Sequence, residues 1–228
     1  MIGAAAAGLM VAGLAAHGTW HRNSIVFGSV LARLPGDEKV VSITFDDGPN
    51  PDATPRILDV LSREGVHATF FVLGRHADRW PDLVRRMADE GHQLGNHGYF
   101  HRKLHRRFPG YIRDDLTRGA DAIERASGVR PAHFRAPHGF RNPWVTPIAR
   151  SLGERTIGWS LGVWDSARPG ADEIVTRTLE GMRAGSILLL HDGDGYDVGG
   201  DRTQTAEAVP RIVDGLRARG FGFVTLPN

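Results

Sequence analysis

The stretch VSITFDDGPN, residues 41 to 50, ends an apolar, β-branched run with two adjacent carboxylates, Asp46 and Asp47. The run is typical of a buried strand, and the Gly-Pro pair that follows it is typical of a turn. A turn needs only one Asp or Asn, and two like charges this close raise each other's pKa unless something positive lies nearby. The second carboxylate therefore indicates a functional site at the end of this strand.

The chain beyond residue 38 continues with the same pattern of a strand followed by a helix. Helical periodicity, opened by Pro and closed by Gly in several places, predicts helices over 54–64, 81–90, 111–127, 172–183 and 205–219. Short apolar runs predict strands at 40–45, 67–73, 92–97, 132–137, 155–161, 186–191 and 221–226. This alternation predicts an α/β fold with a parallel sheet, in one domain over 38–228.

Polar or ionisable side chains follow five of the seven predicted strands. An open sheet gathers its site between two neighbouring strands, whereas a barrel brings many strand ends to one face. The sequence therefore predicts a closed or nearly closed (β/α) barrel. The side chains expected to meet at its face are those of Asp46, Asp47, His97, His101, Arg135, Trp164, Asp165 and His191.

The overall composition excludes some classes of function. The 228 residues include 28 Lys and Arg against 26 Asp and Glu, so the charge balance does not favour a nucleic-acid partner. No cysteine is present, which excludes a thiol nucleophile, a cysteine zinc site and disulfides.

The first 16 residues, MIGAAAAGLMVAGLAA, carry no charge, and the first Lys or Arg is Arg22. As a helix this stretch would span about 24 Å, against about 30 Å for the hydrocarbon core of a bilayer. One interpretation is a buried or frayed N-terminal helix. The one that we favour is a membrane anchor or signal segment over 1–22, with membrane association through residues 1–16. The protein would then be membrane-associated or extracytoplasmic, although the positive residues after the segment leave a cytoplasmic location open.

His97 and His101 are four residues apart, a spacing that recurs in metal sites built from histidine pairs. With Asp47 they make a three-ligand set that leaves coordination positions open, as in catalytic zinc sites. A metal would also explain the paired carboxylates. Asp47 would be a ligand, and Asp46 would stay free to take a proton from water.

Four segments, TFDDGP (44–49), NHGYFH (96–101), FRAPHG (134–139) and ILLLH (187–191), resemble the successive motifs of the polysaccharide deacetylases, the NodB-homology domain of carbohydrate esterase family four. The resemblance runs from about Val40 to Leu226. It implies a distorted barrel of fewer than eight strands and a divalent metal, usually Zn²⁺, with Co²⁺, Mn²⁺ or Ni²⁺ as alternatives. It also implies hydrolysis of N-acetyl, sometimes O-acetyl, groups on glycans.

The same resemblance implies a role for each catalytic residue. Asp46 would be the general base and Arg135 would orient it, while Asp47, His97 and His101 would hold the metal. His191 would be the general acid, and Asp165 would be the partner of either Arg135 or His191.

The resemblance also implies how the substrate is held. The backbone N–H near His138 would help to bind the oxyanion. Trp164 and the apolar residues around Leu189 would line the slot that takes the acetyl methyl group. The chain departs from the family pattern at Gly98, where Ser or Thr is usual, and at Arg168, where an Asp-Trp pair often begins.

Two other functions fit part of this pattern. Two histidines and a carboxylate also suit the Fe(II) of a non-haem oxygenase, although Asp46 and the α/β pattern argue against it. A catalytically silent, membrane-anchored glycan-binding module is the second alternative. The partner that we expect is an acetylated glycan, with no nucleic acid, and we expect a monomer. Peptidoglycan, chitin oligomers, other exported polysaccharides and acetyl xylan all remain open as substrates.

Overall fold

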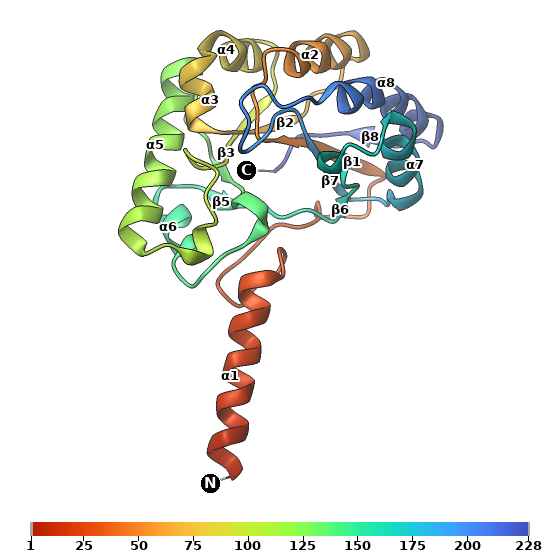
Figure 1. Cartoon of the computed structure of the whole chain (residues 1–228). Helices are drawn as coiled ribbons and strands as arrows, with labels where there is room; N and C mark the ends of the chain where they lie inside the picture. Colours follow the sequence, from red (N-terminus) through yellow and green to blue (C-terminus); the bar gives the residue numbers. More distant parts are fainter. Residues whose placement is uncertain (1, 228) are drawn as a thin grey trace.

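A parallel β-sheet that curls into a partial barrel forms the centre of the protein, and helices cover its outer face (Figure 1). The computed structural model describes residues 2–227. Seven strands follow one another across the sheet in the order β5-β4-β3-β2-β1-β7-β6, and β8 pairs with the start of β1. The strands are β1 Val40–Asp46, β2 Thr69–Val72, β3 Gln93–Asn96, β4 His133–Phe134, β5 Arg155–Thr156, β6 Leu161–Gly162, β7 Ile187–His191 and β8 Gly222–Phe223. The predicted α/β barrel-like fold is confirmed.

The central strand β1 is buried from Val41 to Asp46 between its neighbours β2 and β7. The register pairs Asp46 with Phe71 of β2 and with His191 of β7. Because parallel strands end at the same edge, this register brings the ends of β1 and β7 together.

The stretch 155–161 is not the single strand that the sequence predicts. It forms β5 and β6, which are the two opposite edges of the sheet. Between them the N–H of Ile157 donates to the carbonyl of Phe134 in β4 (2.8 Å), and that of Ser160 donates to the carbonyl of Ile187 in β7 (3.2 Å). Four residues thus carry the chain from one edge to the other. Because the sheet is curled, residues 157–160 can leave their hydrogen bonds with β4 and reach β7 near the opposite edge.

Five helices begin and end near the predicted positions, whereas residues 74–79 and 145–151 form two helices that the sequence did not predict. Pro81 opens α4, and Gly65 and Gly128 end α2 and α5 in the left-handed conformation that glycine adopts without strain. The α-helices of the barrel are α2 Ala53–Glu64, α3 Gly74–Arg79, α4 Pro81–Asp89, α5 Pro109–Ser127, α6 Val145–Ser151, α7 Ala171–Gly181 and α8 Thr203–Ala218. Short 3₁₀ helices lie at η1 Leu104–Arg106, η2 Pro137–Gly139 and η3 Asp165–Ala167.

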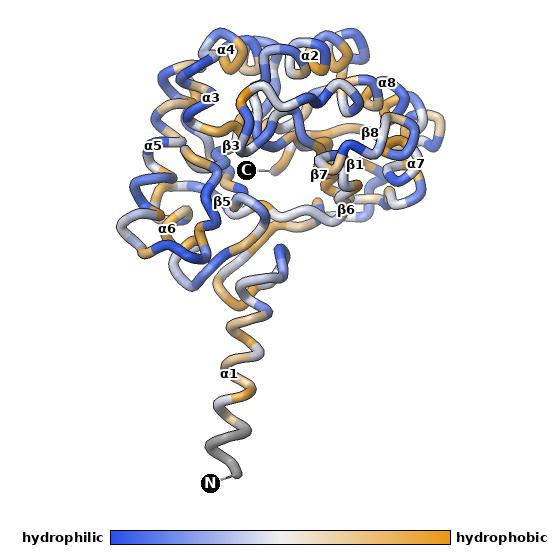
Figure 2. The backbone as a smooth tube through the Cα atoms, viewed as in Figure 1, coloured by the Kyte–Doolittle hydropathy of each residue, from blue (hydrophilic) through white to orange (hydrophobic). Residues whose placement is uncertain are grey.

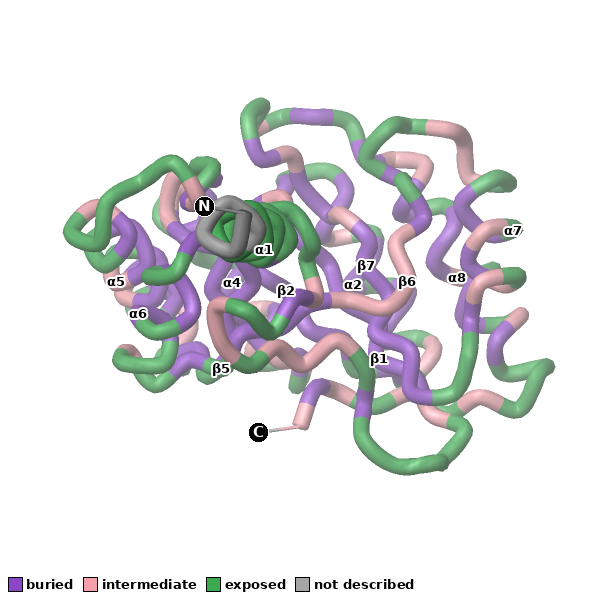
Figure 3. The backbone as a smooth tube through the Cα atoms, turned by 90° about the horizontal axis from the view of Figure 1, so that it is seen from below, coloured by how far each residue is buried: buried purple, intermediate pink, exposed green. Residues whose placement is uncertain are grey.

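Helix α1, Ile2–Trp20, extends away from the barrel (Figure 1). Its last residue packs on the domain, with the ring of Trp20 5.1 Å from that of Phe140. Figures 2 and 3 show that the coloured part of the helix before this contact, over residues 7–16, is largely apolar and exposed, and Leu9 and Val11 are examples. Within residues 2–227, no helix combines the length and the apolar character needed to cross a bilayer.

Candidate metal and catalytic site

The carboxyl ends of β1, β3, β4 and β7 bring most of the predicted residues to one place. Asp46 and Asp47 end β1, His97 follows β3, Arg135 follows β4 and His191 ends β7. All but His191 are at least nine-tenths buried. Their meeting follows from the parallel sheet, in which all these strands end at the same edge.

Asp47, His97 and His101 form a compact set of metal-ligand atoms. Asp47 Oδ1 lies 3.3 Å from His97 Nε2 and 3.1 Å from His101 Nε2. One ligand atom from each residue lies within 4.8 Å of the others. His97 donates its Nδ1–H to the carbonyl of Arg135 (2.8 Å), which leaves the Nε2 lone pair directed toward Asp47.

The charge states at these three residues also suit a metal. Burial lowers the pKa of His101 to about 3, so its imidazole is neutral. Burial alone would raise the pKa of Asp47, but the adjoining imidazoles of His101 and His97 outweigh it and hold that pKa below its usual range. A carboxylate and neutral imidazoles are the forms that bind metal. Among the described residues, nothing donates a hydrogen bond to the buried Asp47 Oδ1, which is costly unless a cation is present. The donor set therefore fits a divalent metal.

Asp46 is held by a buried arginine, Arg135, that follows β4, two strands beyond the β2 neighbour of β1. Arg135 donates to Asp46 Oδ1 (2.7 Å) and to the hydroxyl of Thr44 (2.8 Å). Its guanidinium also lies 4.1 Å from the ring centre of Phe71. The other carboxylate oxygen, Oδ2, is 3.8 Å from His97 Nε2. One oxygen of Asp46 is thus fixed by Arg135 while the other faces the predicted metal site.

The backbone of Asp47 adopts a left-handed conformation, with φ 73°. A non-glycine residue is strained there and needs support from its surroundings. Buried His76 supplies it by donating Nδ1–H to the carbonyl of Asp47 (2.8 Å). Sequence reasoning missed His76, and no motif or spacing in the chain would have indicated it.

His191 and Asp165 form a pair beside the carboxylates. Asp165 accepts from His191 Nδ1 (2.9 Å), from the backbone N–H of His191 (2.8 Å) and from the hydroxyl of Thr205 (3.0 Å). Burial alone would lower the pKa of His191, but the charge of Asp165 and its hydrogen bond outweigh it and raise that pKa to about 9. Of the two partners considered for Asp165, the structure places it against His191.

Gly98 has φ 76°, which favours glycine, and a side chain there would collide with Asp115. The carboxylate of Asp115, from α5, accepts the backbone N–H groups of Tyr99 (3.1 Å) and Phe100 (3.2 Å). These contacts brace the loop between the two histidines without a hydroxyl at residue 98. The role of Asp115 was not predicted from the sequence. The available signal was the missing hydroxyl at residue 98, which implied that another side chain braces the loop.

The three predicted substrate-binding residues lie in different settings. His138 has φ 61° within η2, and its ring centre is 4.6 Å from that of His101. Leu189 lies in β7 with 7% of its surface exposed, whereas Trp164, next to Asp165, is 75% exposed. Trp164 is thus accessible to a ligand, whereas Leu189 presents only a small part of its surface.

Comparisons with known proteins identify the family of the chain. The family model described as polysaccharide deacetylase matches residues 33–157. A chitooligosaccharide deacetylase of Bradyrhizobium sp. (strain ANU 289) is 40% identical over 197 residues, covering 82% of this chain and 89% of the relative. The solved Bc1960 peptidoglycan N-acetylglucosamine deacetylase superposes with a TM-score of 0.82 at 32% identity, over 87% of this chain and 91% of that one. The pseudoenzyme BA3943 of Bacillus anthracis gives 0.79 at 26% identity, over 86% and 67%. The chain belongs to the polysaccharide deacetylase family.

Proposed function

We propose that this protein is a metal-dependent hydrolase that removes N-acetyl, or also O-acetyl, groups from a polysaccharide. One observation carries the proposal: the Asp47–His97–His101 set lies beside a second buried carboxylate, Asp46, which Arg135 holds at 2.7 Å. The activities named for the relatives, on chitooligosaccharide and peptidoglycan, support it. Which glycan is the substrate depends on the loops around the site.

Asp47, His97 and His101 would hold the metal, most simply Zn²⁺, with Co²⁺, Mn²⁺ or Ni²⁺ as alternatives. When bound, such an ion polarises an acyl carbonyl and makes water a better nucleophile at neutral pH. The protein side chains do the remaining chemistry.

Asp46 is the proposed general base, because Arg135 leaves its Oδ2 free and facing the metal ligands. His191, kept protonated by Asp165, is the proposed acid that gives a proton to the departing amine. The backbone N–H near His138 would stabilise the oxyanion. Trp164 and Leu189 would line the slot for the acetyl methyl.

The alternative is a catalytically silent glycan-binding module, and the pseudoenzyme among the structural neighbours shows that this fold also occurs without activity. The presence of Asp46, Arg135 and His191 in hydrogen-bonded arrangements argues against it here. A binding module needs neither a buried base nor a paired acid.

We also propose that residues 1–16 hold the protein at a membrane surface. The support is the exposed apolar surface of α1, including Leu9, Met10 and Leu14. Flotation with phosphatidylcholine vesicles tests this, since a variant lacking residues 1–16 should stay in the soluble fraction. Equal flotation of both forms contradicts it.

The proposed function is tested by acetate release from a panel of acetylated glycans, with zinc-loaded protein beside chelator-stripped protein. We expect acetate from at least one glycan, lost on stripping and restored by metal. Failure of zinc-loaded protein on every glycan, with zinc shown to be bound, would favour the binding module. Iron content with oxygen-dependent turnover would instead favour an oxygenase.

The Asp165→Asn variant should change the pH profile of acetate release. A general acid must be protonated, so activity is present below the pKa of His191 and is lost as the pH rises through it. Asp165 raises that pKa to about 9, so removing its charge should move the alkaline limb to lower pH. The profile of kcat/KM from pH 6 to 10 measures this, with thermal unfolding as the check on folding. An alkaline limb that stays in place would contradict the role of His191.

A further inference from the structure

The rim loop, defined here as residues 193–202, places Tyr196 beside the metal ligands. Its hydroxyl lies 2.8 Å from His138 Nε2. Its ring meets that of His101 edge to face, with the centroids 5.2 Å apart. Even so, 61% of Tyr196 is exposed. Two imidazoles therefore hold the ring from one side, and the rest of it is open to solvent.

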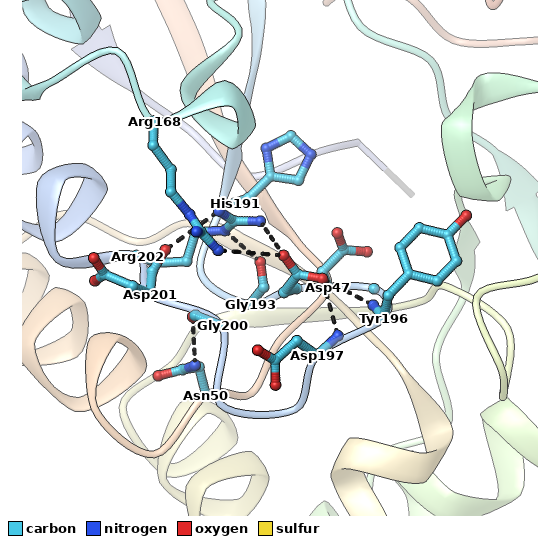
Figure 4. A network of polar contacts seen from close by, with 12 residues as sticks. Asp47, Asn50, Arg168, His191, Gly193, Tyr196, Asp197, Gly200, Asp201 and Arg202 are labelled. Carbon is cyan, nitrogen blue, oxygen red and sulfur yellow. Dashed lines mark hydrogen bonds and ion pairs between the residues drawn. The ribbon is translucent and has the colours of Figure 1, made fainter.

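The rim loop is fixed from several directions (Figure 4). Buried Arg202 donates to one carboxylate oxygen of Asp194 (3.0 Å), and the other oxygen accepts the backbone N–H of Tyr196 (2.9 Å). On the other side, Arg75 donates to the carbonyl of Gly195 (2.7 Å). A ring that is already held in place loses little freedom when a ligand binds.

We propose that Tyr196 stacks on the sugar ring next to the one that carries the acetyl group, an inference that rests on the proposed function. Sugars have apolar C–H faces edged by hydroxyls, and an exposed aromatic face with a polar tip matches both. The position beside His101 puts this platform next to the reacting group. Tyr196 would then make the enzyme prefer linked sugars over a single acetylated sugar.

The test compares kcat/KM for acetate release from tetra-N-acetylchitotetraose and from N-acetylglucosamine, using zinc-loaded protein. Y196A should lower the preference for the tetramer about tenfold, the equivalent of one stacking contact. Y196F, which keeps the ring, should retain that preference. Phe108→Ala removes another exposed aromatic, at the start of α5, and is the matched control that should leave both rates unchanged.

Two outcomes would overturn the inference while leaving the proposed function in place: a preference that Y196A leaves unchanged, even if both rates fall by the same factor, or a loss of preference in Y196F as large as in Y196A. The last would assign the effect to the hydroxyl. If the wild-type protein releases no acetate from either sugar, the proposed function fails for these glycans. In that case the Kd of tetra-N-acetylchitotetraose, measured by calorimetry, tests the stacking role. Equal Kd values for wild type and Y196A would overturn it.

Discussion

Asp46→Asn should reduce acetate release by about 10²- to 10⁴-fold, the usual contribution of a positioned general base. The Asn side chain keeps an oxygen that can accept a hydrogen bond from Arg135. However, an amide is not a base and cannot take a proton from water. Metal should stay bound, because Asp46 is outside the Asp47–His97–His101 set. Steady-state rates and metal content measured on the same preparation test both halves of this expectation.

Asp52→Asn is the matched control for that change. It is the same substitution six residues later, at an exposed position just before α2, and it should leave activity unchanged. Because Arg135 is buried, Asp46→Asn also leaves a guanidinium without its counter-charge, so thermal unfolding must show that the variant is folded. A folded variant with wild-type activity would rule out Asp46 as the base.

Asp47→Asn should abolish activity by a different route, through loss of the metal. We expect zinc affinity to fall by at least about 100-fold, the upper end of what losing only an outer-shell partner costs. Without metal, the variant should be less stable than wild type at neutral pH, because a pKa of Asp47 below its usual range means that the folded protein favours the charged form.

Calorimetry and thermal unfolding with and without zinc measure this second effect. Zinc at 100 times its wild-type Kd should stabilise the wild-type protein by about 2.7 kcal/mol, and that increment should fall to about 0.4 kcal/mol or less in Asp47→Asn. Asp46→Asn, the same change at the adjacent residue, is the control that should keep the increment. If Asp47→Asn gains as much stability from zinc as the wild-type protein does, the ligand assignment is wrong.

The contrast between these neighbours explains why a buried strand ends in two carboxylates. The chain reverses at Asp47, with φ 73°, so the two side chains point to different partners. Asp46 reaches Arg135 at 2.7 Å, and Asp47 reaches His101 at 3.1 Å. Each carboxylate thus has its own partner, and these two contacts offset the repulsion between the adjacent negative charges.

The sequence alone determined the alternation of the main strands with the five longer helices of the barrel, and it predicted the ligands. These follow from local signals: apolar runs, Pro and Gly at helix ends, and short motifs that directly follow strands. Because parallel strands end at one edge, polar residues such as Asp47, His97 and His191 had to meet once the strands were recognised.

The tertiary structure alone decided how the site is supported. Asp115 braces the histidine loop from α5, His76 holds the strained backbone of Asp47, and Tyr196 reaches His138 from the rim loop. It also split the predicted strand at 155–161 between two edges of the sheet. Such contacts join residues far apart in the chain, and they depend on sheet curvature and loop path, which leave no periodic pattern in a single sequence.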